Sequence, residues 1–195
     1  MQILDVHVKF SPFVMKRVIG TIFALFSICS VAATSEMIVN RIAVEVSESF
    51  DGFEGTFETL PDGFSVSKDG SNLLTAADSD DFKGIHSGGA REGACRAWDL
   101  GTNDYALGYQ PTSDEFTPGF FMVVVSNATG RMIRSAEIEY EVVCFNNEDR
   151  SSSLELQYSL ENLPFTTLNS TRFESPETED PELEWSVHRF AARIV

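Results

Sequence analysis

The longest regular pattern in the chain is an alternation of apolar and polar residues between positions 135 and 160. Apolar side chains occupy every second position from Ala136 to Cys144, and serine and glutamates fill most of the positions between them. After a polar break, the alternation returns from Leu154 to Leu160. Because successive side chains of a β-strand point to opposite faces, this period of two predicts two strands with one buried and one solvent-facing side.

A continuous apolar segment, residues 120–125, precedes this alternation and predicts a strand that is buried more completely. Together the three segments indicate an antiparallel sheet whose apolar face packs on another layer. Shorter segments rich in β-branched and aromatic residues, separated by turn residues, predict further strands. They lie at 38–46, 64–66, around Ile85, and at 94–98, 105–109 and 185–195.

Between these segments the chain is polar, and we expect loops over most of 68–93 and over 163–181. Outside the first 33 residues no segment shows a helical period. The sequence therefore predicts an all-β protein, an antiparallel β-sandwich with jelly-roll-like connectivity. The segment 185–195 either supplies the closing strand or shows that the C-terminal strands of such a sandwich are missing.

The N-terminal region has the composition of an export signal. Met15-Lys16-Arg17 is a basic start, residues 18–29 are apolar but too short for an ordinary membrane span, and small residues up to Ala33 offer a cleavage site. We expect translation to start at Met15, residues 1–33 to be an upstream extension plus signal, and residues 34–195 to be one domain. This predicts a secreted, periplasmic or cell-surface protein that is not held in the membrane after the signal is removed.

Composition narrows the choice of partners. The hydrophobic content of 43% is enough for a packed core, and the formal net charge is −16. Binding of nucleic acid needs clustered lysine and arginine to contact phosphates, so this charge argues against a nucleic-acid partner. An acidic surface is typical of soluble exported proteins.

Two blocks of the chain resemble a known type of module. They are residues 57–64, Phe-Glu-Thr-Leu-Pro-Asp-Gly-Phe, and residues 94–108, from Ala-Cys-Arg-Ala-Trp-Asp-Leu-Gly to Asp-Tyr-Ala-Leu-Gly. With the strands at 120–160, they resemble a bacterial exported β-sandwich module. Such modules occur on the N-terminal side of secreted endonuclease/exonuclease/phosphatase-type proteins and in surface-sorted proteins. These motifs are structural, and the resemblance implies a fold without implying catalytic residues.

Removal of the signal would leave two cysteines, Cys95 and Cys144. In an exported protein they could form a disulfide, which would close a loop of about fifty residues and stabilise the fold by roughly 4 kcal/mol. The alternative is two separate buried thiols that behave as small apolar side chains. The sequence leaves both open.

Two groups of side chains are candidate binding residues. Asp78, Asp80 and Asp81 could offer oxygen ligands to calcium, although they lack the spacing of a known calcium loop and also suit a solvated loop. Trp98, Tyr105 and Tyr109 could stack on a sugar ring if they face outward, but aromatic residues in a sandwich more often lie in the core. No other cofactor is indicated.

No catalytic motif is recognisable in the sequence. There is no Gly-x-Ser-x-Gly, P-loop or HExxH pattern, and His86 and His188 are far apart along the chain. We therefore expect a non-enzymatic module for binding or spacing in an exported protein, with a carbohydrate or another cell-surface component as partner. The alternatives are an accessory domain of a secreted hydrolase or nuclease, and a structural or adhesive surface protein.

Overall fold

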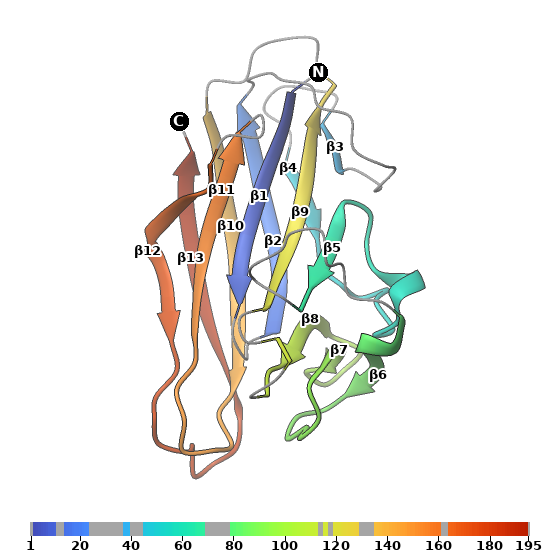
Figure 1. Cartoon of the computed structure of the whole chain (residues 1–195), viewed down its shortest axis with the longest axis vertical. Coiled ribbons are helices and arrows are strands. Elements are labelled where there is room, and N and C mark those ends of the chain that lie inside the picture. The colour runs from blue at the N-terminus through green and yellow to red at the C-terminus, as the bar shows by residue number, and fades with distance from the viewer. Residues whose placement is uncertain are drawn as a thin grey trace.

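A computed structural model describes residues 2–10, 14–23, 37–39, 45–68, 79–112, 115–116, 119–128, 135–160 and 164–194. Two stacked β-sheets make up this part of the chain (Figure 1). Apart from two single-turn 3-10 segments, η1 (Phe57–Thr59) and η2 (Ser79–Asp81), its regular structure is all strand. The predicted all-β, antiparallel sandwich is confirmed. The described part contains no helix with the length and apolar character that a membrane crossing requires.

The first sheet, sheet A, has the strand order β12-β11-β1-β9-β3, and β5 pairs with β9 beside β3. Its strands are β1 (Gln2–Phe10), β3 (Met37–Val39), β5 (Phe64–Ser67), β9 (Gly119–Asn127), β11 (Ser153–Leu160) and β12 (Thr166–Glu174). All its pairs are antiparallel except β3 with β9.

The second sheet, sheet B, has the order β13-β10-β2-β8-β7-β6, and β4 pairs with β2. Its strands are β2 (Val14–Phe23), β4 (Glu45–Glu48), β6 (Phe82–His86), β7 (Ala94–Asp99), β8 (Tyr105–Gln110), β10 (Ser135–Phe145) and β13 (Trp185–Ile194). Consecutive strands mostly lie in opposite sheets, as expected for jelly-roll-like connectivity, and only β6 and β7 pair in parallel.

The core lies between the sheets and follows the predicted alternation. Along β10, the residues from Ala136 to Cys144 at every second position are buried in it, whereas Glu137 and Glu139 are exposed. Tyr140 links the two layers, because its hydroxyl donates a hydrogen bond to the Thr171 carbonyl of β12 at 3.1 Å. The strands expected at 64–66, 94–98, 105–109, 120–125 and 135–160 are all present.

The strand β12 was not expected from the sequence. The structure forms β12 within the segment that we assigned to a polar loop. Its sequence, TTLNSTRFE, buries only Thr171 and Phe173 because β12 is the edge strand of sheet A. A polar edge strand lacks the regular apolar alternation on which the prediction depended.

The N-terminal region is the second difference. Residues that we assigned to an extension and an export signal form β1 and β2, which lie inside the sheets: β1 pairs with β9 and β11, and β2 pairs with β10, β4 and β8. Export and removal of residues 1–33 remain predictions, and such removal would take one inner strand from each sheet.

The strand at 120–125 and the C-terminal segment 185–194 are both paired within the sheets. β9 has β1 on one side and both β5 and β3 on the other. β13 pairs with β10 over its whole length, from Trp185 opposite Phe145 to Ile194 opposite Ala136. Val187 is 48% exposed and Ile194 is buried.

Candidate ligand-binding site

The three aromatic residues that we considered as a sugar platform do not lie on one surface. Tyr109 is buried between the sheets, where its hydroxyl donates to the Gly119 carbonyl at 2.7 Å and its ring stacks on Phe116. Tyr105 packs against the same core. Trp98 belongs to a separate cluster on the outer face of sheet B. The structure therefore separates Trp98 from the two tyrosines.

Trp98 instead meets aromatic residues that are distant in the sequence. Its ring centroid lies 5.9 Å from that of Trp185 on β13 and 5.6 Å from that of His86 on β6. Trp185 in turn lies 5.2 Å from Phe145 on β10. We call these four residues the aromatic cluster. Both tryptophans of the chain belong to it.

Small side chains let the two indoles meet across the sheet. Ala90, Ala106 on β8 and Val143 on β10 form one buried cluster with Trp98, and Trp185 packs against it. Trp98 is 3% exposed, whereas Trp185, His86 and Phe145 are half-buried. The cluster thus has a buried base and an accessible aromatic surface.

Two buried donors on the outer face of β7 have no hydrogen-bond partner in the described part of the chain. They are Nε1 of Trp98 and Nε of Arg96, two positions apart on the strand. The rest of the Arg96 guanidinium is engaged: Nη1 donates to the Lys83 carbonyl at 3.1 Å, and Nη2 lies 3.9 Å from Glu92. Burial lowers the Arg96 pKa, and Glu92 opposes that change. Because unpaired buried N–H groups are rare and costly, such donors mark places where polar ligands or water are accommodated.

A small polar cavity of about 80 Å³ adjoins the aromatic cluster at Phe145. Its wall is formed by the end of β10, the loop after it, the end of β8, and the segment after β12. The lining residues are Gln110, Pro111, Cys144, Phe145, Asn146, Asn147, Glu148, Arg150, Ser152 and Ser175. Phe145 therefore belongs both to the cavity lining and to the aromatic cluster.

Hydrogen bonds between two loops hold the cavity wall in place. Asn146 Nδ2 donates to the carbonyls of Pro176 at 3.2 Å and Thr178 at 2.6 Å. Ser152 and Ser175 are joined by two bonds: the Ser175 N–H donates to the Ser152 carbonyl at 2.9 Å, and the Ser152 N–H donates to Ser175 Oγ at 3.0 Å. These loops follow β10 and β12 and lie together at the lower end of the molecule in Figure 1.

The charged and polar side chains at this cavity differ in how far they are engaged. Arg150 forms an ion pair with Glu148, so each charge is compensated locally. Gln110 Nε2 makes only a long bond of 3.4 Å to the Pro111 carbonyl. The Asn147 carboxamide has no hydrogen bond to any residue that the structure describes. Gln110 and Asn147 therefore have bonding capacity left for a ligand.

Cys144 lines the cavity with a thiol that stays protonated. Burial raises its pKa to about 12, and the nearby Asp180 carboxylate adds to the shift. The nucleophilic form of cysteine is the thiolate, so at neutral pH this group acts as an apolar wall.

The structure has no disulfide between the two described cysteines. Cys95 and Cys144 are both free and buried. They lie on β7 and β10, which β8 and β2 separate in sheet B. The alternative of two separate thiols is the one that the structure contains.

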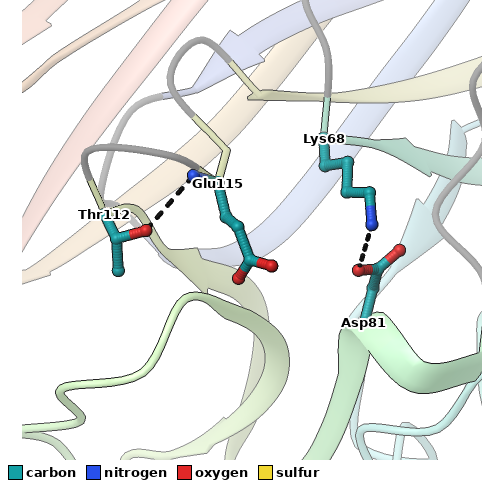
Figure 2. A network of polar contacts seen from close by, with 4 residues as sticks. All are labelled: Lys68, Asp81, Thr112 and Glu115. Carbon is teal, nitrogen blue, oxygen red and sulfur yellow. Dashed lines mark hydrogen bonds and ion pairs between the residues drawn. The ribbon is translucent and has the colours of Figure 1, made fainter.

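The calcium candidates are only partly described. Asp78 lies outside the described residues, while Asp80 and Asp81 lie in η2. Asp81 is buried, and its Oδ1 forms an ion pair with Lys68 Nζ at 2.8 Å (Figure 2). Nearby, the Glu115 N–H donates to Thr112 Oγ1 at 3.2 Å. Among described residues no three histidine, cysteine or acidic side chains gather as a metal site.

His86 and His188 lie on β6 and β13, at opposite edges of sheet B. His86 Nδ1 accepts from the Gly88 N–H at 3.2 Å, within the aromatic cluster. His188 contacts Phe173, with ring centroids 4.3 Å apart, and burial lowers its pKa. They do not form a joint site.

Sequence reasoning found Trp98 but missed Trp185, Phe145 and the cavity residues. The available signal was weak: Trp185 opens a predicted strand, and Phe145 follows one. Only the register Phe145 opposite Trp185 brings those two rings together. Comparisons of this chain with protein-family models, with curated proteins and with solved structures found no match.

Proposed function

We propose that this protein is an exported, non-enzymatic β-sandwich module that binds carbohydrate. The observation that carries the proposal is the meeting of both tryptophans with His86 and Phe145 on one partly exposed surface, beside a polar cavity. Aromatic rings offer flat apolar faces for the C–H face of a sugar ring, and amide side chains offer hydrogen bonds to its hydroxyl groups. Ligand sites commonly combine an aromatic surface with a few placed polar groups.

The chemistry of the cavity supports binding over covalent catalysis. Its cysteine stays protonated at neutral pH because burial raises its pKa to about 12. Among its described lining residues, the charges of Arg150 and Glu148 compensate each other in an ion pair. The export part of the proposal rests on the sequence of residues 15–33, and it places the module outside the cell or on its surface.

The test is a glycan array probed with the full chain and with Trp185→Ala. We expect the unaltered protein to bind a subset of glycans and Trp185→Ala to lose at least about tenfold in affinity, because removing a stacking ring costs roughly 1.5 kcal/mol or more. Phe57→Ala is the matched control, since Phe57 is 50% exposed on η1 and contacts Phe82 outside the cluster. Absence of any glycan binding by the unaltered protein would refute the proposal.

A further inference from the structure

We infer that the sugar bound by this module is uncharged, and that its hydroxyl groups bind in the cavity beside Phe145 through the Asn147 and Gln110 carboxamides. The inference rests on the proposed carbohydrate binding and specifies which sugars bind and which side chains select them.

The aromatic cluster and the cavity meet at one residue, Phe145. Phe145 lines the cavity and lies 5.2 Å from the Trp185 ring. A sugar ring stacked on the accessible edge of the cluster at Trp185 would reach the cavity with its neighbouring hydroxyl groups. One ligand can therefore use both surfaces.

The polar groups that the cavity offers include carboxamides, those of Asn147 and Gln110. A carboxamide presents both an N–H donor and a carbonyl acceptor, which is what a hydroxyl group, itself donor and acceptor, requires. Asn147 has no bond to a described residue, and Gln110 has only its long contact with the Pro111 carbonyl. By contrast, Asn146 already uses its amide to join the loop 175–178. Asn147 and Gln110 are therefore two lining residues whose carboxamides can still bind a ligand.

The charge at the cavity and on the whole chain favours an uncharged ligand. Among the described residues that line the cavity, Arg150 carries the one guanidinium, and it is paired with Glu148, so little positive charge remains for a carboxylate or sulfate. The chain as a whole carries −16 and repels anions at long range. Uronic-acid and sulfated glycans are therefore disfavoured relative to neutral ones.

The loops that form the cavity are held in place before a ligand binds. The wall of the cavity is held by the Asn146 bonds and the reciprocal Ser152–Ser175 pair. A site that is already ordered avoids the entropy cost of arranging its loops when the ligand binds. The Asn147 side chain therefore projects from a fixed loop.

The experiment is a fluorescence titration of the full chain. Both tryptophans lie in the cluster, so their emission reports binding there without a label. The probes are neutral gluco-, galacto- and manno-oligosaccharides and an oligogalacturonate. Each is titrated at about 20 mM and at about 200 mM salt, below and above physiological ionic strength. We expect at least one neutral series to bind with an affinity that is insensitive to salt, and the oligogalacturonate not to bind.

Asn147→Ala should weaken binding of the neutral probe by about tenfold, as expected for the loss of roughly one hydrogen-bond pair. Asn169→Ala, which removes an exposed amide from β12 in the other sheet, is the matched control and should leave affinity unchanged. Thermal unfolding of both variants verifies that each is folded, and Asn147→Asp, which keeps the size of the side chain, provides a second test of the amide.

The outcomes separate the two proposals. Neutral binding that is lost in Trp185→Ala but unchanged in both Asn147 variants would overturn the role of the cavity while leaving carbohydrate binding in place. Tighter binding of the oligogalacturonate than of every neutral probe would overturn the charge argument. No binding of any probe, together with an empty array, would instead overturn the proposed function itself.

Discussion

At the scale of single residues, the buried cysteine thiols and the buried Tyr140 hydroxyl make the stability of the fold sensitive to pH in the alkaline range. Burial raises the pKa of Cys144 and of Tyr140 to about 12, and it also raises that of Cys95. A group whose pKa is higher in the folded state favours folding while it is protonated. Its contribution is complete below the unfolded-state pKa and is lost as pH rises toward the folded-state pKa.

We therefore predict that the melting temperature falls between about pH 9 and pH 12. A decrease of roughly 5 °C from pH 8.5 to pH 10.5 is expected, measured by circular dichroism. Cys144→Ala removes one of these groups, so its melting temperature should fall less steeply over the same range. An identical pH dependence in the variant would show that the thiol does not contribute.

At the scale of elements, a glycine contact positions the segment before η1 against β6 and β7. Gly55 has φ +73°, and its carbonyl accepts from the Gly84 N–H at 2.9 Å. A Cβ atom at Gly55 would lie 2.1 Å from the Gly84 carbonyl oxygen and 2.8 Å from the Ala97 nitrogen. Both neighbours are backbone atoms, which cannot move aside without shifting a strand.

Gly55→Ala should therefore lower the free energy of unfolding by about 3 kcal/mol, because it combines an unfavourable φ with a backbone collision. Chemical denaturation followed by fluorescence would measure this change. Gly52→Ala is the matched control: it has nothing within 4 Å of its Cβ position, so a change of less than about 0.5 kcal/mol is expected. Equal effects of the two substitutions would contradict the role of the Gly55–Gly84 contact.

At the scale of the whole molecule, the two N-terminal strands, β1 and β2, are inner strands of the two sheets. β1 lies between β9 and β11, and β2 lies between β10 and β8. A chain of residues 34–195, which is what export processing would leave, loses both strands and exposes the backbone groups of their neighbours.

We predict that this shorter chain is less cooperative in thermal unfolding than the full chain and associates in size-exclusion chromatography. A monomer with one sharp transition would instead show that the remaining strands close the sheets without β1 and β2. Mass spectrometry of protein recovered from the medium or periplasm of an expression host would establish independently whether residues 1–33 are removed.

The sequence by itself determined which residues face the core. The alternation along 135–145 and 153–160 predicts which side of β10 and β11 faces the core, and every second residue from Ala136 to Cys144 does lie in it. The opposite side is less exposed than expected, because Ser135 and Ser159 are buried as well. The prediction of the core-facing side works because the two faces of a strand are a local property of an extended chain. The same logic identified the short strands β5, β7 and β8 and the absence of a helical pattern after residue 33.

Only the tertiary structure decided which strands are neighbours, and with them the candidate site. The register of β10 with β13 places Phe145 beside Trp185, and the small Ala106 and Val143 let Trp98 meet Trp185 across the sheet. The same strand order puts Cys95 and Cys144 on strands that do not pair, β7 and β10, and gives polar β12 its place at an edge. Strand pairing joins residues that are far apart in sequence, so its outcome depends on the packing of the whole sandwich and cannot be read from any local pattern.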